Sequence, residues 1–426
     1  MQRYFKVIVL IMLTLLLNTI TGLAQDTSVL TLEMVQELAR KNYPLIRQQD
    51  LIRQTENYSL SNLNRNYLPQ FSINGQATYQ SDVTSLPISI PNSIVEPQDK
   101  DQYKITADVN QIIYDGGVTR YQKKTQEIVA ITSEEQLQVE FQKLSDRINQ
   151  LYLGILLVSE QLHQSETVKA DLNVGIKRVE AQVKEGTAFR SNLSALQVEQ
   201  LKNDQRKDEL STTRKGLCEV LSLLINTNIT EKTQLAVPYS NIEASPVIVR
   251  NELRIFQLQD SLLGVQKAMI GIKNRPRLSL FAQGGYGKPG LNFLSNEFDW
   301  FYLGGVKMSW NFGGLYTSGK EKNINERNRL SSEIQKDLFL LNTNAILIQQ
   351  RAELEKLKKT LESDEQIIQL RNEIKEAAST QLSNGVITSS DYIREVNAAD
   401  QAITTKIVHE LQLVLTQLNY QNTLGK

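Results

Sequence analysis

Side chains that commonly carry catalysis or bind metal ions are few in this sequence and lie far apart. The 426 residues include two histidines, His163 and His409, and one cysteine, Cys218. Both histidines fall in helical tracts without an accompanying motif, so exposed or locally hydrogen-bonded imidazoles are expected. Cys218 has no partner for a disulfide within the chain and is expected to be a small buried apolar side chain. The sequence therefore predicts no catalytic residue, no metal site, no cofactor and no enzymatic activity.

Two glycine pairs are the other candidates for chemistry. Gly116-Gly117 follows Tyr114-Asp115, and Gly313-Gly314 follows Asn311-Phe312. A glycine-rich turn can bind phosphate through its backbone amides, but such a loop continues with Lys and Ser or Thr, which neither pair has. We expect both pairs to form bends where a strand passes into a helix, since backbone freedom is needed there.

Charge gives no reason to expect nucleic acid as a partner. Lys and Arg together number 47, and so do Asp and Glu, which gives a formal net charge of zero. A protein that binds duplex DNA normally carries a basic excess or a basic stripe.

Residues 1–24 have the pattern of a secretory signal peptide. Arg3 and Lys6 precede an apolar run at residues 7–17, and small residues follow. A retained membrane anchor is the alternative, but this run falls short of the ~20 apolar residues that a helix needs to span a bilayer. We expect cleavage after this segment, and no later apolar run is long enough for a transmembrane helix.

Long helices are predicted twice in the chain. The nine prolines leave residues 98–237 and 290–426 without any, and a proline inside a helix costs ~3 kcal/mol. The glycine pairs match at an offset of 197 residues, whereas Gly186 and Gly385 match at an offset of 199. Apolar residues with the spacing of a coiled-coil seam also match at 197, namely Leu137, Phe141, Leu144, Ile148, Leu151 and Ile155 with Ile334, Leu338, Leu341, Ala345, Ile348 and Ala352. We infer a tandem duplication with a two-residue slip inside the second long helix.

Each repeat is predicted to contain an antiparallel helical hairpin. Residues 320–384 contain neither Gly nor Pro and would extend ~100 Å as one helix. A plain coiled-coil rod is the alternative, and the segments between the helical tracts argue against it. The predicted organisation is a first repeat at 25–240, with a hairpin at about 116–235 that turns near Gly186, and a second repeat at 241–426, with a hairpin at about 314–424 that turns near Gly385.

Four segments alternate apolar and polar residues as amphipathic strands do, at about 69–86, 99–114, 276–288 and 298–312. A soluble β-sandwich alternates in the same way. The two tryptophans, Trp300 and Trp310, are ten residues apart, or ~24 Å of height at the usual tilt of a barrel strand, which matches an outer-membrane apolar band between aromatic girdles. We therefore favour a membrane β-barrel whose girdle aromatics include Tyr79, Tyr103, Trp300 and Trp310.

Four strands in one chain leave two unpaired edges, which lipid cannot satisfy. A closed barrel therefore needs several chains. Two chains would give eight strands and a barrel filled by side chains, whereas three would give twelve strands and an opening. The polar inner face favours three.

The chain at this point resembles the TolC family of outer-membrane channel-tunnels. The resemblance covers residues 28–424 and rests on the doubled order of two strands, Gly-Gly, a long helix, a glycine turn and a second helix. It implies a mainly α protomer that forms a homotrimer, with a 12-stranded barrel in outer-membrane lipid and a tunnel of twelve helices across the periplasm. It also implies a passive exit duct of a tripartite efflux or type I secretion system, with an inner-membrane pump and a periplasmic adaptor protein as partners.

The resemblance further implies an acidic periplasmic entrance at the hairpin turns. Counting from the glycine of each turn, the family's acid falls on Asp391 in the second repeat and on Asn192 in the first. A second acidic position falls on Arg394, which reverses the sign. We hypothesise that Asp391 and Arg394 help hold the entrance closed. The alternative is that Asp391 only starts a helix and Arg394 is a solvated surface charge.

Two other function classes stay open. A periplasmic adaptor also carries a long helical hairpin, but only one, flanked by several soluble β domains. A trimeric coiled-coil surface protein would need no amphipathic strands in each half. The transported substrate and the pump family are not predicted.

Overall fold

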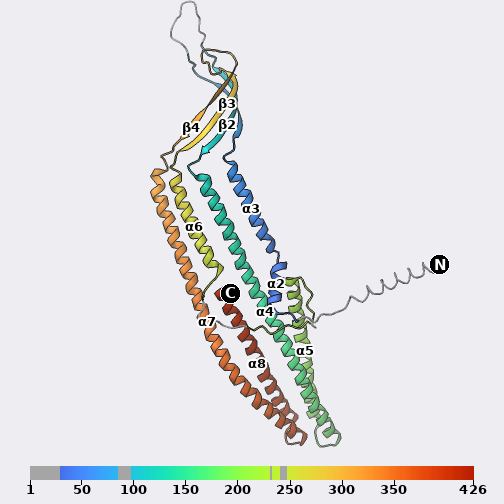
Figure 1. Cartoon of the computed structure of the whole chain (residues 1–426). Coiled ribbons are helices and arrows are strands. Elements are labelled where there is room, and N and C mark those ends of the chain that lie inside the picture. The colour runs from blue at the N-terminus through green and yellow to red at the C-terminus, as the bar shows by residue number, and fades with distance from the viewer. Residues whose placement is uncertain (1–28, 85–96, 231–232, 240–246) are drawn as a thin grey trace, which may run out of the picture. The chain divides into compact units, whose positions relative to one another are not determined.

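The structure is a computed structural model that describes residues 29–84, 97–230, 233–239 and 247–426. The predicted signal peptide at 1–24 lies outside the described residues. The elements follow in the order α2 (Leu32–Asn42), α3 (Ile46–Arg65), β1 (Gln70–Tyr79), β2 (Asp101–Tyr114), α4 (Val118–Lys184), α5 (Arg190–Ile225), α6 (Asn251–Ile272), β3 (Arg277–Lys288), β4 (Asp299–Ser309), α7 (Leu315–Ser383) and α8 (Ser389–Leu424) (Figure 1).

The two halves of the chain have the same element order and nearly equal element lengths. The long helices α4 and α7 have 67 and 69 residues, and the return helices α5 and α8 have 36 each. The two extra residues of α7 account for the change of offset from 197 to 199 between the bends and the hairpin turns. The predicted duplicated architecture of four strands and long helices is confirmed.

The strands differ from their predicted bounds mainly at two ends. β1 ends at Tyr79 rather than near 86, because the alternation of apolar and polar residues stops at Gln80-Ser81-Asp82. β4 ends at Ser309 rather than 312, since Asn311 and the glycines after it already belong to the bend.

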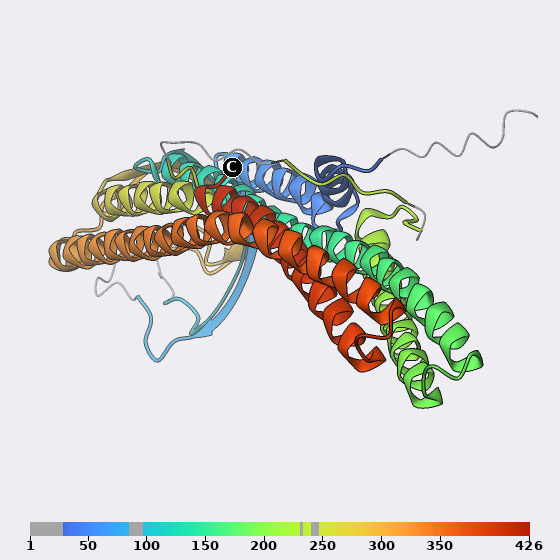
Figure 2. The same cartoon turned by 90° about the horizontal axis from the view of Figure 1, so that it is seen from below.

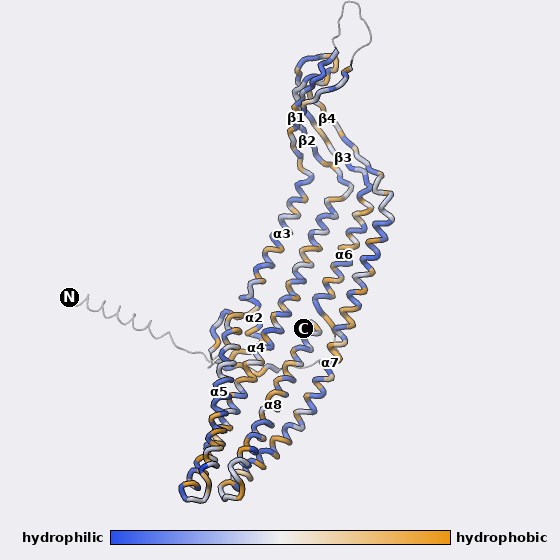
Figure 3. Tube along the Cα trace, turned by 180° about the vertical axis from the view of Figure 1, so that it is seen from behind, coloured by the Kyte–Doolittle hydropathy of each residue, from blue (hydrophilic) through white to orange (hydrophobic). Residues whose placement is uncertain are grey.

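The four strands form one antiparallel sheet in the order β1-β2-β3-β4. The register places Phe71 opposite Val109, Ile105 opposite Tyr286, and Tyr286 opposite Trp300. Most apolar positions of the four strands therefore share one face, and most polar positions share the other, where Phe281, Phe301 and Leu303 are the exceptions. Figure 3 shows the alternating colours along the strands. The apolar face is uncovered in the single chain, and Phe71 is 78% exposed.

The chain divides into two compact units that do not coincide with the two repeats. One unit comprises residues 47–140 and 249–343, and it contains the sheet, α3, α6 and the adjoining parts of the long helices. Its core includes Ile128, Leu258 and Val265. The other unit comprises the described residues up to 46, with 141–248 and 344–426, and it contains α2, α5, α8 and the hairpin turns.

The duplicated apolar seam is buried in the first long helix and exposed in the second. Leu137 is 4% exposed on α4, whereas its counterpart Ile334 on α7 is 67% exposed. Of the same seam, Phe141 and Ile148 are buried, while Leu338, Leu341 and Ile348 are exposed. The helix α2 explains part of this difference, because Arg40 stacks on the Phe141 ring and Gln36 donates a hydrogen bond to Asn149.

None of the helices in the described part of the chain has an apolar stretch that would cross a bilayer.

Candidate functional site

The candidate entrance lies at the turns of the two helical hairpins, where each long helix reverses direction. Gly186 and Gly385 both have a left-handed backbone, with φ of 74° and 70°. Each stands two residues after the last residue of its long helix. After each glycine a 6→1 hydrogen bond closes the turn, from Thr187 N to Gln182 O at 2.9 Å and from Val386 N to Gln381 O at 2.9 Å. Glycine is favoured here because a side chain at positive φ would be strained.

Asp391 closes a capping box at the start of α8. Its carboxylate accepts from the Thr388 hydroxyl at 2.7 Å and from the Thr388 amide at 3.2 Å, while its own amide donates to the Thr388 hydroxyl. These bonds, and after them the charge of Arg394, hold the pKa of Asp391 below its usual range. The carboxylate is therefore committed first to starting its own helix.

Arg394 pairs with acids of its own helix. Its guanidinium lies 3.3 Å from the Asp391 carboxylate and 3.2 Å from that of Glu395, and its side chain is 69% exposed. In the first repeat, Asn192 occupies the place of Asp391 without the same cap. Phe189 stands at the N-cap there, offers no side-chain hydrogen bond, and accepts from the Asn192 amide through its carbonyl at 3.0 Å.

The two hairpins contact each other through residues that sequence reasoning did not select. Figure 2 shows the α4–α5 and α7–α8 turns side by side. The Arg178 guanidinium donates to the Ser379 hydroxyl at 2.6 Å and to its carbonyl at 2.9 Å. The Lys375 ammonium lies 2.7 Å from the Asp171 carboxylate. These bonds join α4 to α7 near the turns.

An apolar core lies beside these polar contacts. The Tyr392 ring is 2% exposed and packs with Leu172, Leu196 and Leu382, which come from α4, α5 and α7. Its hydroxyl donates to the Asp171 carbonyl at 3.1 Å. Burial, followed by the nearby Asp171 carboxylate, raises the pKa of Tyr392. Tyr392 thus anchors α8 on the first hairpin. We call Asp171, Arg178, Lys375, Ser379 and Tyr392 the inter-hairpin cluster.

The return helices are also joined. Arg206 of α5 lies 2.7 Å from the Asp400 carboxylate of α8, and the Asn397 amide donates to Glu199 at 2.9 Å. Near the turns, the contacts therefore run from each helix of one hairpin to a helix of the other.

Solved structures of bacterial outer-membrane channels are similar to this chain over nearly its whole length. The outer membrane protein VceC from Vibrio cholerae has a TM-score of 0.69 at 13% identity, over 92% of this chain and 96% of that one. The Campylobacter jejuni CmeC channel has a TM-score of 0.67 at 12% identity, over 94% and 87%. The open state of the Neisseria gonorrhoeae MtrE channel has a TM-score of 0.66 at 14% identity, over 92% and 88%.

This chain has a TolC-like fold. The comparison with protein-family models and with curated proteins gives no match. Because the identities to the solved channels are low, the likeness is one of architecture.

The strand-to-helix bends of the TolC-like fold are built differently in the two repeats. After β2, Gly116 and Gly117 have positive φ, and the Asp115 carboxylate accepts from the amides of Gly117 at 2.8 Å and Thr119 at 2.6 Å. Burial raises the pKa of Asp115, but the hydrogen bonds from Thr119, Gly117 and Tyr67 outweigh this and leave the pKa lowered.

In the second bend, Gly313 and Gly314 do not have positive φ. The Asn311 side chain accepts from the Gly313 amide at 2.8 Å, as Asp115 does in the first bend. A Cβ at Gly314 would overlap the end of the Asn274 side chain, which would have to move. The prediction of two equivalent glycine bends therefore misses this difference.

Aromatic side chains gather at both ends of the apolar face. At the turn end, Tyr286 packs against Trp300 and Phe298, with ring centroids 5.0 and 5.5 Å apart, and Tyr103 stacks on Phe298 at 6.3 Å. Tyr79 is also at this end, opposite Asp101. At the helix end, Trp310 packs on Phe312 at 4.8 Å. Sequence reasoning missed Tyr286, which alternation alone places on this face.

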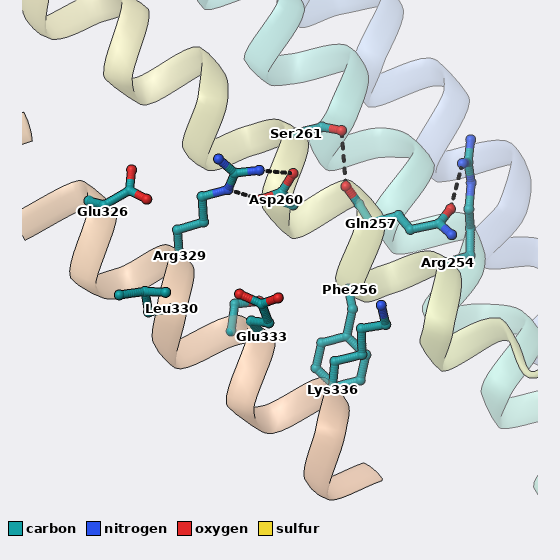
Figure 4. Close-up of a pocket in the computed structure, with 11 residues that line it drawn as sticks. Arg254, Phe256, Gln257, Asp260, Ser261, Glu326, Arg329, Leu330, Glu333 and Lys336 are labelled. Carbon is teal, nitrogen blue, oxygen red and sulfur yellow. Dashed lines mark hydrogen bonds and ion pairs between the residues drawn. The ribbon is translucent and has the colours of Figure 1, made fainter. Parts of the chain in front are cut away.

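Two polar cavities lie in the unit that contains the sheet. One, of about 270 Å³, is on the polar face, where Asp108 accepts from Asn74 and Thr106 and Lys104 lies over the Phe301 ring. The other, of about 710 Å³, lies between α6 and α7 (Figure 4). Two of its charged side chains pair across the cavity, Arg329 of α7 and Asp260 of α6, at 2.6 Å. Neither cavity has the arrangement of a nucleophile and its base.

The cysteine and the two histidines do not form a reactive site with one another. Cys218 is buried. His409 shares a 2.6 Å contact with Asp364 across the α7–α8 hairpin, and His163 is exposed on α4. Within the described residues, no group of three or more metal-binding side chains comes together.

Proposed function

We propose that the protein is an outer-membrane exit duct that passively conducts substrates across the periplasm and the outer membrane. The observation that carries this proposal is the sheet. It has an uncovered apolar face, an opposite polar face and unpaired outer edges on β1 and β4. An apolar face of this size is stable in lipid, and the open edges can be satisfied there only by further strands.

The proposed assembly is a homotrimer in the outer membrane. Three copies of the sheet give a twelve-stranded barrel with a polar lumen. The exposed α7 seam at Ile334, Leu338, Leu341 and Ile348 supports an oligomer, since large apolar side chains in this spacing normally contact another helix. A sister subunit is the partner that a symmetric assembly provides.

The proposed partners are a periplasmic adaptor protein and an inner-membrane pump, which supplies the energy. We propose that the system is a tripartite efflux or type I secretion system, and the likeness to the outer-membrane channels CmeC and MtrE supports this. No chemistry is proposed in the lumen, and no nucleic-acid partner. An adaptor would show one hairpin, whereas the described residues contain two.

The proposed closed entrance depends on the contacts near the hairpin turns. Asp391 and Arg394 contribute there through the start of α8, while the inter-hairpin cluster supplies the contacts between hairpins. Opening of the entrance requires the second hairpin to move away from the first. We therefore assign Asp391 and Arg394 a supporting role in gating.

Tryptophan fluorescence tests the membrane placement of the sheet. Because Trp300 and Trp310 are the only tryptophans, the variants Trp300→Phe and Trp310→Phe each report from one end of the apolar face. In vesicles, brominated lipids should quench both variants, and aqueous iodide should quench neither strongly. Strong iodide quenching without quenching by brominated lipid would contradict the placement.

A further inference from the structure

Two positive side chains stand together on the polar face of the sheet, at its helix end. Arg277 begins β3 and Lys307 lies near the end of β4. The register pairs Arg277 with Ser309 and Ser279 with Lys307, so the two cations are diagonal neighbours on one face. Leu278 and Met308, the next residues along each strand, belong to the apolar face. Arg277 and Lys307 therefore lie on the polar face.

Both cations are exposed, and over the residues that the structure describes neither has an ion pair. Diagonal neighbours on one face are ~7 to 8 Å apart, and like charges at short range disfavour the fold. A protein gains stability by separating or neutralising such a pair. The pair therefore points to a role outside folding.

No acid of the sheet lies close enough to neutralise the pair. Asp108, on the same face, is opposite Gln283, six residues from Arg277 along β3, which is ~20 Å. Asp299 is at the turn end of β4, eight residues from Lys307, or ~27 Å. Both separations exceed the Debye length of ~8 Å at physiological ionic strength. Asp115, at the nearby bend, follows Tyr114, which pairs with Leu278, so its negative charge lies near Arg277. It is buried, and its carboxylate accepts from the amides of Gly117 and Thr119 rather than from either cation, so one acid stands against two cations and the net charge there stays positive.

We infer that Arg277 and Lys307 form a positively charged ring at the helix end of the barrel lumen, which favours the passage of anionic solutes over cationic ones. The inference rests on the proposed trimeric barrel, in which two cations per chain give six around the lumen. Such a ring concentrates anions and repels cations over the short distance where it is unopposed. The substrate class that the ring favours is then anionic solutes.

Ion selectivity in planar bilayers tests the ring, with the full-length protein in a KCl gradient. The reversal potential gives the ratio of chloride to potassium permeability. Arg277→Gln combined with Lys307→Gln should lower this ratio by roughly twofold or more, because the local potential is removed. The matched control, Arg277→Lys combined with Lys307→Arg, keeps both charges and should keep the ratio.

The outcomes separate this inference from the proposed function. Channels whose ratio is the same in the wild type and the Gln variant would overturn the ring and leave the duct intact. Failure of the wild type to form any channel would overturn the duct, and the ring with it.

A second readout does not depend on conductance. Lys307→Cys places a thiol beside Arg277, and the natural Cys218 is buried. An anionic thiosulfonate reagent should label this thiol faster than a cationic one, and Arg277→Gln should abolish the preference. Equal labelling rates by the two reagents in both backgrounds would overturn the inference.

Discussion

The Tyr392 hydroxyl donates to the backbone carbonyl of Asp171 across 3.1 Å and thereby joins the start of α8 to the C-terminal part of α4. The Asp171 carboxylate binds Lys375 of α7 at 2.7 Å. One residue of the first hairpin therefore holds both helices of the second. Any separation of the hairpins must break these bonds and uncover the Tyr392 ring.

Tyr392→Phe should favour the open entrance while keeping the packing of the ring. Loss of one hydrogen bond costs about 1 kcal/mol, which acts on the closed arrangement. We expect a larger or more frequently open conductance in planar bilayers. Tyr316→Phe, at an exposed tyrosine of α7, is the matched control and should behave as the wild type. Equal conductance of the two variants would contradict a latch at Tyr392.

Gly175→Ala should push the hairpins apart at the same place. A Cβ at Gly175 would lie 2.8 Å from Tyr392 Cε1, which is closer than van der Waals contact allows. The control is Gly216→Ala, in α5, where an added Cβ meets no atom within 4 Å. There the substitution should stabilise the helix by up to ~1 kcal/mol. Thiol crosslinking between α4 and α8 should weaken in Gly175→Ala only, and unchanged crosslinking would argue against close packing there.

The double variant Asp391→Ala with Arg394→Ala tests the gating role of these two residues. We expect increased conductance, because α8 loses its capping box and the ion pair beside it. Thr388→Ala removes the capping hydroxyl but keeps both charges. If Thr388→Ala increases the conductance as the double variant does, Asp391 and Arg394 act through the start of the helix. If only the double variant increases the conductance, the charges of the two residues are responsible. No change in conductance in the double variant would end the gating claim.

Asp115→Asn should destabilise the β2–α4 bend in a pH-dependent way. The pKa of Asp115 is lowered in the folded protein, so its ionised form stabilises the fold above the unfolded pKa of about 3.9. That contribution is lost as the pH falls through the lower, folded pKa. Thermal unfolding should show the wild type more stable at neutral pH, with the gap closing in acid. Asp337→Asn, at an exposed acid of α7, should give no such trend, and a pH-independent gap for Asp115→Asn would refute this account.

Most of the fold could be predicted from the sequence because its signals are local. Strand alternation, proline-free tracts and turn glycines each act over a few residues, and the duplication repeats them. The sequence also placed Asp391 at a helix start, but sequence reasoning did not select its capping partner Thr388, although the spacing of three residues is that of a capping box.

The inter-hairpin cluster could not be predicted in this way. Asp171 and Lys375 are 204 residues apart in sequence, and they meet only because α4 and α7 pack in a particular rotation. The difference in burial between the apolar seams of α4 and α7 could not be predicted from the sequence either. Leu137 and Ile334 are similar in type and match in the repeat, but the packing of α2 in the first repeat is a tertiary feature that spacing does not reveal.

The exposed α7 seam and the open sheet edges require more than one chain, so the number of chains per particle is the most direct test. Size exclusion with light scattering on detergent-extracted protein should give three chains per particle from the outer membrane. Leu341→Asp should reduce that number, while Asn342→Asp, its exposed neighbour, should not. A stable monomer in buffer without detergent would contradict the account.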